Sequence, residues 1–161
     1  LLVDIIKQET EYDMYFTFTV QEEVGLRGAA AAAFSVAPDY AIILEGTTAA
    51  DLPCVSAPNT VCCVGDGPAI PFMDRATLYD REMYEEAFKT AEDMGIACQS
   101  KSLASGGNNA GSIQKSGNGV RCLAVNVPVR YLHSPSCMAN INDIKNAGAL
   151  AKAIAEKYAA K

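Results

Sequence analysis

Residues 120–129 read VRCLAVNVPV, a long run in which Leu123, Val125 and Val127 alternate with smaller side chains. An apolar run rich in β-branched residues is typical of a buried strand. Shorter runs of the same kind predict further strands over residues 14–20, 40–44, 69–73 and 96–100.

Helical patterns separate these predicted strands. Residues 78–94 place Met83 and Phe88 near one face and glutamates mainly on the other, and Gly95 follows as a stop. An alanine run predicts a helix within residues 25–34, and Asn142 and Asp143 are candidate N-caps of a last helix. Residues 1–9 have the spacing of a helix end. Strands that alternate with helices predict an α/β fold, a three-layer α/β/α sandwich.

Composition excludes several classes of protein. The chain has 161 residues, which suits one domain, and 13 Lys and Arg against 19 Asp and Glu give a net charge of -6. An acidic surface repels phosphate backbones, so we expect no nucleic-acid partner. No apolar run approaches the roughly 20 residues that a bilayer span needs, so we expect no membrane partner. Six cysteines without a CxxC pair indicate free thiols and a cytoplasmic protein.

Acidic and imidazole groups follow three of the predicted strands. Glu22 and Glu23 come after the first, Glu45 after the second, and His133, which is the one histidine of the chain, after the last. Ligands and catalytic groups in α/β sheets collect at the carboxyl ends of strands. Carboxylates with an imidazole suit zinc, cobalt or manganese. One of two adjacent carboxylates could bind the metal while the other acts as general base.

Each of these features also has an ordinary interpretation. A Glu-Glu pair is usually solvated surface, and a lone histidine is more often structural than a ligand. The glycine-rich loop over residues 105–111 could form an anion-binding nest, but it lacks GxGxxG or Walker spacing. A helix N-terminus capped by Asn108 is the favoured interpretation of that loop.

Two strings carry a family resemblance. Residues 18–29 read FTVQEEVGLRGA and residues 128–135 read PVRYLHSP. Between them lie LEGTTAAD at 44–51, Gly67-Pro68, Met73-Asp74-Arg75 and GGNNAG at 106–111. In this order the strings resemble the co-catalytic metallo-aminopeptidases of the tetrahedral and glutamyl aminopeptidase type, whose members are often labelled cellulase or endoglucanase.

The resemblance implies an enzyme, a metallo-aminopeptidase that releases N-terminal residues from peptides. It implies a zinc-exopeptidase-like fold with a central mixed sheet and two divalent metal ions, zinc or cobalt. Glu22 matches the general base, and Glu23 and His133 match ligands of one metal. Glu45 stands where the family has an acidic ligand of the second metal, commonly Asp.

The chain also departs from the family pattern. Asn109 stands where many relatives have Asp, and Gln114 where many have His. An upstream His-x-Asp motif, a metal-bridging aspartate and an inserted oligomerisation domain are absent from the sequence. We therefore expect residues 1–161 to be one partial catalytic domain, incomplete at the N-terminus, that alone holds metal weakly and is inactive. The resemblance implies that the parent protein is a homo-oligomer.

Two other function classes remain. A glycoside hydrolase, as the family labels suggest, needs two carboxyl groups that flank one bond, and Glu22 and Glu45 could supply them. This alternative gives His133 no role, whereas the metal site uses it. A non-catalytic module is the other alternative, since the isolated chain lacks upstream ligands.

Overall fold

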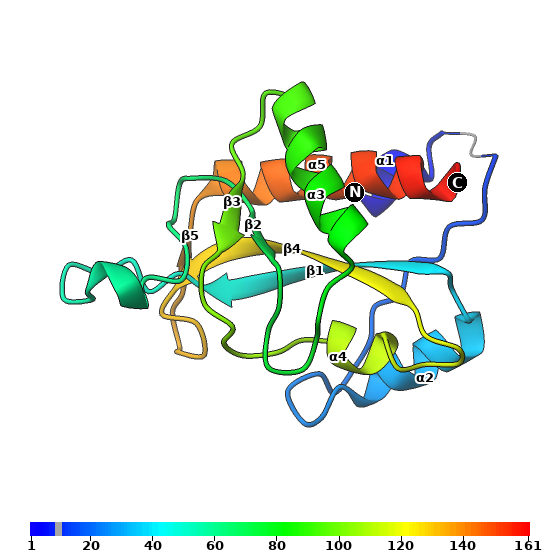
Figure 1. The fold of residues 1–161 in the computed structure, drawn as a ribbon, viewed down its shortest axis with the longest axis horizontal. Coiled ribbons are helices and arrows are strands. Elements are labelled where there is room, and N and C mark those ends of the chain that lie inside the picture. Colours follow the sequence, from blue (N-terminus) through cyan, green and yellow to red (C-terminus); the bar gives the residue numbers. More distant parts are fainter. Residues whose placement is uncertain (9–10) are drawn as a thin grey trace.

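The centre of the molecule is a twisted mixed β-sheet (Figure 1). The computed structural model describes residues 1–8 and 11–161. In these residues the strands pair in the order β1-β4-β2-β3, and β5 pairs with the end of β4. The strands are β1 (Tyr40–Thr48), β2 (Ala69–Pro71), β3 (Gln99–Lys101), β4 (Arg121–Arg130) and β5 (Met138–Ala139).

Strand directions make the sheet mixed, as predicted. β1 runs parallel to β4 over nine residue pairs, from Tyr40 opposite Arg121 to Thr48 opposite Val129. β2 is parallel to β3, but antiparallel to β4. The carboxyl ends of β1 and β4 therefore meet at one edge of the sheet, and that edge is where the predicted site residues should gather.

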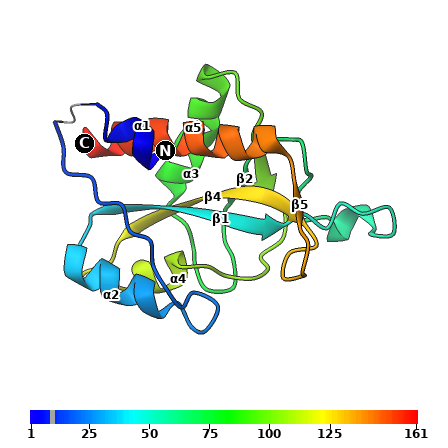
Figure 2. The same ribbon diagram turned by 180° about the vertical axis from the view of Figure 1, so that it is seen from behind.

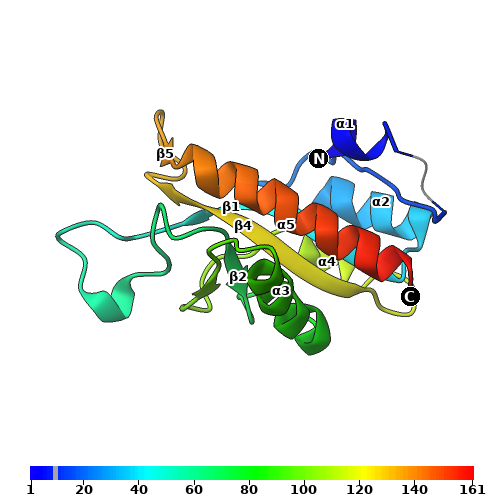
Figure 3. The ribbon, with the colours of Figure 1, turned by 90° about the horizontal axis from the view of Figure 1, so that it is seen from above.

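Helices cover both faces of the sheet, which confirms the three-layer architecture (Figures 1 and 2). α5 and α3 pack on one face, and α2 and α4 lie on the other. Seen from above, α5 lies along β4 and β1 (Figure 3). The helices are α1 (Leu2–Ile5), α2 (Arg27–Val36), the 3-10 turn η1 (Ala57–Asn59), α3 (Arg81–Asp93), α4 (Ala110–Ile113) and α5 (Ile141–Ala159). α1 falls within the predicted helix end at 1–9, of which residue 9 lies outside the described residues.

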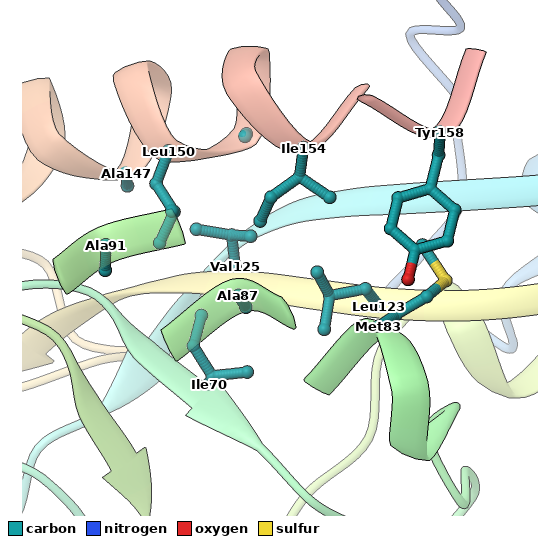
Figure 4. Packing of buried hydrophobic residues seen from close by; sticks show 11 residues of the cluster. Ile70, Met83, Ala87, Ala91, Leu123, Val125, Ala147, Leu150, Ile154 and Tyr158 are labelled. Carbon is teal, nitrogen blue, oxygen red and sulfur yellow. The ribbon is translucent and has the colours of Figure 1, made fainter. Parts of the chain in front are cut away.

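The main core lies between the sheet and the α3–α5 layer (Figure 4). Leu123 and Val125 point from β4 toward α5, where Leu150 and Ile154 meet them, and Met83 closes the cluster from α3. All five side chains are fully buried. The alternate β4 residues, Cys122 and Ala124, pack on the opposite face with Ala110 of α4. β4 is thus buried on both faces, which accounts for its continuous apolar sequence.

Capping residues set the start of the two long helices. α3 begins at Arg81 rather than at the predicted residue 78, because the Asp80 side chain accepts a hydrogen bond from the Met83 N–H and acts as N-cap. The predicted caps of α5 are wrong, since Asn140 is the N-cap. Asp143 is instead buried one turn later, where its carboxylate accepts hydrogen bonds from the backbone N–H groups of Gly65 and Gly67 at 2.7 and 3.0 Å.

The predicted strand over residues 14–20 is wrong. These residues belong to the described part of the chain, and they form no strand there. Tyr15, Phe18 and Val20 are exposed, and Phe18 is 84% accessible. High β-propensity reflects packing against a neighbouring strand rather than a preference of the backbone alone. The aromatic residues give this stretch a high strand propensity, but in the described chain no neighbouring strand pairs with it.

The predicted free cysteines agree with the structure. Cys62 and Cys122 are buried, and burial raises the pKa of each thiol to about 12. Within residues 1–8 and 11–161, none of the helices combines the length and apolar character needed to cross a bilayer.

Candidate active site

Glu22 and Glu23 lie in a tight turn rather than at a strand end. The carbonyl of Glu22 accepts hydrogen bonds from the N–H groups of Gly25 and Leu26 at 3.1 and 3.0 Å. Gln21 and Leu26 have positive φ angles of 61° and 57°. Left-handed backbone at non-glycine residues is costly, and strained residues of this kind cluster at functional sites as well as in ordinary turns. The two carboxylates are therefore presented by a strained turn that precedes α2.

A glycine anchors this turn to α2. The Gly28 N–H donates to the Val20 carbonyl at 3.0 Å. A Cβ atom on Gly28 would lie 2.4 Å from the Val20 oxygen and 2.6 Å from the Val20 nitrogen. Only glycine permits this approach, because both contacts are with backbone that cannot rotate away. The close approach of Val20 therefore explains why Gly28, the second glycine of the VGLRG string, is a glycine.

Glu45 lies inside β1, not after it, because β1 continues to Thr48 instead of ending at the predicted residue 44. Its register partner on β4 is Asn126, which is 2% exposed. In the described part of the chain, the Asn126 Oδ1 atom accepts no hydrogen bond. Glu45 shares a sheet face with buried Ile43, two residues earlier. It therefore faces the α2–α4 layer, in partly buried surroundings.

His133 lies in the turn that follows β4, as predicted. Its Nδ1 atom is 3.5 Å from Oε1 of Glu23, and both side chains are largely exposed, at 67% and 73%. His133 itself has a φ of 61°, and so does Tyr131. The strained backbone of this turn faces the strained turn of Glu22 and Glu23.

The charges of the site act on one another. Burial raises the pKa of Glu22 above 4.5, the Glu23 charge raises it further, and His133 lowers it. Burial also raises the pKa of Glu45, and the charges of Glu22 and Glu23 add to that effect. All four predicted site residues are thus within electrostatic reach of one another. A carboxylate whose pKa is raised toward neutrality is a stronger proton acceptor, as a general base requires.

Part of this cluster fits a divalent metal. Two ligands that each lie about 2.0–2.1 Å from a tetrahedral zinc are about 3.3–3.4 Å apart, and the Glu23–His133 distance of 3.5 Å is close to that value. Among residues 1–8 and 11–161, however, no group of three Asp, Glu, His or Cys side chains is arranged to hold one ion. The described residues thus bring together two of the predicted metal ligands, Glu23 and His133, without a third beside them.

Asn109 and Gln114, two residues that differ from the family pattern, both make side-chain hydrogen bonds. Asn109 Nδ2 donates to Thr19 Oγ1 at 3.2 Å, just before the Glu22 turn, and Gln114 Nε2 donates to the Ala76 carbonyl at 2.7 Å. The first of these bonds ties α4 to the segment that carries the two carboxylates. A helix does begin in this loop as predicted, but its N-cap is Asn109 rather than Asn108, and the Asn109 side chain makes no capping bond. Asn108 Oδ1 accepts a hydrogen bond from the Ala110 N–H at 2.9 Å, at the start of α4.

An ion pair beside the site was not predicted. Asp51 and Arg130 form two parallel hydrogen bonds, each 2.7 Å long. The Arg130 guanidinium holds the pKa of the Asp51 carboxyl below its usual range. Both residues lie within the strings that carry the family resemblance, but nothing in their spacing, 79 residues apart, indicates that they meet.

Known proteins share this sequence and fold. The sequence profile described as M42 glutamyl aminopeptidase matches residues 1–150. The chain is 43% identical to a candidate aminopeptidase of Acetivibrio thermocellus over 91% of its length, and 32% identical to a lysyl aminopeptidase of Pyrococcus furiosus over 92%. It covers 44% and 42% of those two proteins, so it spans less than half the length of these curated relatives.

Solved structures agree with the sequence comparison. An aminopeptidase of the archaeon Desulfurococcus kamchatkensis superposes with a TM-score of 0.89 at 31% identity, over 97% of this chain and 45% of that one. A Pyrococcus horikoshii peptidase that assembles into a tetrahedron or a large octahedral shell gives 0.69 at 33% identity, over 88% and 39%. A Thermotoga maritima protein named endoglucanase gives 0.71 at 31% identity, over 98% and 45%. The chain belongs to the M42 glutamyl aminopeptidase family.

Proposed function

We propose that the whole protein containing this chain is a metal-dependent aminopeptidase that releases N-terminal residues from peptides. The observation that carries the proposal is the convergence of Glu22, Glu23, Glu45 and His133 at one edge of the sheet, with Glu23 and His133 3.5 Å apart. Family membership supports the same reaction, and three relatives are named as aminopeptidases.

Glu22 is the proposed general base. It is half-buried, and its raised pKa is caused first by burial and then by the neighbouring Glu23 charge. In this role it takes a proton from the water that attacks the peptide carbonyl and returns it to the leaving amine. A divalent ion at this site would polarise the carbonyl and lower the pKa of bound water.

Glu23 and His133 would hold one metal ion and Glu45 a second, with zinc or cobalt as the proposed metals. Glu23→Gln and His133→Ala should each lower metal content in the whole protein, because each removes a ligand. Glu22→Gln is the matched control, since it alters the neighbouring carboxylate and should leave metal content unchanged. Metal analysis that finds full occupancy in both ligand variants would contradict the assignment.

A glycoside hydrolase is the second candidate, on the basis of the Thermotoga maritima name. Glu22 and Glu45 would then be the two carboxyl groups, and the contact between Glu23 and His133 would have no catalytic role. Chelation separates the two proposals. A chelator should abolish release of N-terminal residues from an aminoacyl chromogenic peptide, and re-addition of zinc or cobalt should restore it. Chelator-resistant hydrolysis of a glucan would favour the glycosidase.

The isolated 161-residue chain should bind divalent metal weakly and release no N-terminal residues. The support for this is that only two ligands of one ion come together in the described residues, whereas stable zinc sites usually have three or four protein ligands. Titration with zinc or cobalt, together with a peptide assay, tests the prediction. Tight binding with turnover would show that the chain carries a complete site.

The setting of the whole protein is also proposed. We infer that it is a cytoplasmic homo-oligomer in which this chain is one partial catalytic domain. The assembly of the Pyrococcus horikoshii peptidase into closed shells supports the oligomer. Size-exclusion chromatography with light scattering on the whole protein measures it directly, and a monomer would contradict it.

A further inference from the structure

The exits of β1 and β4 are joined by one buried carboxylate. Arg130 is the last residue of β4, and its Nε and Nη2 atoms donate to the two oxygens of Asp51, each at 2.7 Å. The Asp51 side chain is 9% exposed and that of Arg130 31%. A planar guanidinium that bonds both carboxylate oxygens fixes orientation as well as distance, which a lysine cannot do.

Asp51 also closes the loop that follows β1. Its Oδ2 atom accepts a third hydrogen bond, from the Val64 N–H at 2.9 Å. The Ala49 N–H donates to the Val129 carbonyl at 2.9 Å, on the neighbouring strand. The loop that carries η1 projects well away from the sheet (Figure 1), and its two ends meet at Asp51. Arg130 is therefore held against the closed base of a loop.

Left-handed backbone lies on both sides of this ion pair. Ala50, next to Asp51, has a φ of 56°, and Tyr131, next to Arg130, has a φ of 61°. His133, two residues further on, also has a φ of 61°. Residues hold such angles only where surrounding contacts fix them. The local Ser134 N–H to Tyr131 carbonyl bond, at 3.2 Å, shapes the turn, and the pairing of Arg130 with Met138 closes it. The bonds from Arg130 to Asp51 add the contact that fixes the turn against the loop after β1.

We propose that Asp51 and Arg130 are positioning residues that orient the turn after β4 and so hold the His133 imidazole against Glu23. The role of these two residues in catalysis rests on the proposed function. The contact between His133 and Glu23 that they are proposed to hold can be measured without any catalysis. Without the ion pair, the turn would relax from its left-handed angles, and the exposed His133 side chain would move away from Glu23.

The test uses NMR on the isotope-labelled 161-residue chain. His133 is the one histidine of the sequence, so its ring signals need no assignment among histidines. We expect a nuclear Overhauser effect between the His133 ring and the Glu23 side chain in the unaltered chain. Arg130→Lys, which keeps the charge but not the two parallel bonds, should lose it, and Asp51→Asn should weaken it.

Arg121→Lys is the matched control. Arg121 forms the same kind of paired bonds, with Asp80, at the other end of the same strand. The control should keep the effect between His133 and Glu23 while lowering the melting temperature at least as much as Arg130→Lys. If Arg130→Lys and Arg121→Lys both lose the nuclear Overhauser effect, a general loss of stability explains the result and the proposal is wrong. If Arg130→Lys does not fold, Asp51→Asn decides in its place.

Zinc titration gives a second readout. Partners that orient metal ligands typically change affinity about 10–100-fold, so we expect roughly 10-fold weaker zinc binding in Arg130→Lys and an unchanged affinity in Arg121→Lys. An unaltered His133 signal and zinc affinity in both Arg130→Lys and Asp51→Asn would overturn the proposal. Failure of the whole protein to cleave peptides would contradict the proposed function alone, since neither readout here depends on turnover.

Discussion

The two ends of β4 carry the same kind of ion pair in opposite electrostatic settings. At the amino end, Arg121 bonds both oxygens of Asp80, at 2.7 and 2.9 Å, and also Glu82 at 2.7 Å. Its guanidinium also lies over the Tyr40 ring, 5.2 Å from the centroid. The carboxylates of Asp80 and Glu82 are both paired there, and Asp80 additionally caps α3. The amino end is built for stability.

The carboxyl end pairs its arginine equally well but leaves other charges crowded. Beyond Arg130 and Asp51, the carboxylates of Glu22, Glu23 and Glu45 share one region with a single imidazole. Burial and mutual repulsion raise the pKa of Glu22 and Glu45, while the pKa of Asp80 at the other end is lowered, first by its bonds to Arg121. The difference is what we expect if stability is given up at the carboxyl end of the strand for the proposed active site.

The largest expected effect is on turnover at the carboxyl end. Glu22→Gln in the whole protein should lower kcat roughly 10²–10⁴-fold, because general-base catalysis contributes that much. Thermal stability should not fall, since the substitution removes a partly buried charge. A kinetic assay with an aminoacyl chromogenic substrate measures the loss. Glu82→Gln at the amino end is the control and should keep turnover; near-normal rates in the Glu22 variant would show that it is not the base.

The next effect is on stability at the amino end. Asp80→Ala should destabilise the fold by roughly 1–2 kcal/mol, because it removes the N-cap of α3 together with the Arg121 ion pair. For a chain of this size, each 1 kcal/mol lowers the melting temperature by about 2–4 °C. Asp80→Asn keeps the capping oxygen and should lose less. In the whole protein, peptide turnover should be unchanged in both variants. An unaltered melting temperature in Asp80→Ala would remove the contrast between the two ends.

The smallest expected effect is the change in fold stability when one carboxylate is neutralised, and it has opposite signs at the two ends of β4. Glu45→Gln should stabilise the fold at about pH 7, by roughly 0.5 kcal/mol. Because the folded-state pKa of Glu45 is raised above 4.5, the carboxyl group contributes stability below that pH and loses it as the pH rises through the raised value. The gain from the substitution should therefore be present near neutrality and disappear below pH 4.5.

Asp80→Asn gives the matching pH dependence. The folded-state pKa of Asp80 is lowered from 3.8, so its contribution is present above that pH and is lost as the pH falls through the lowered value. The cost of the substitution should be present near neutrality and vanish at pH well below 3.8. Melting temperatures measured across this range separate the two cases. Curves of the same sign for both variants would show that the two ends do not differ electrostatically.

Local sequence predicted much of this fold because its signals act over short distances. The apolar run at residues 120–129 corresponds to β4, and the amphipathic run at 78–94 to α3. Hydrophobic periodicity and glycine stops need no knowledge of distant residues. The strings around Glu22 and His133 also identified the family, since the identity and order of the residues carry that information.

Contacts between distant residues decided the rest. Residues 14–20 have strand propensity but no strand partner in the described chain, and Asp143 resembles a cap but binds the turn at Gly65 and Gly67. The Asp51–Arg130 pair joins residues 79 positions apart, and no periodicity in the sequence indicates that they are in contact. Sequence by itself determined which chemical groups the proposed site contains. Only the tertiary structure set the distances between these groups and the effect of each charge on the pKa of the others, because both depend on which strands lie side by side.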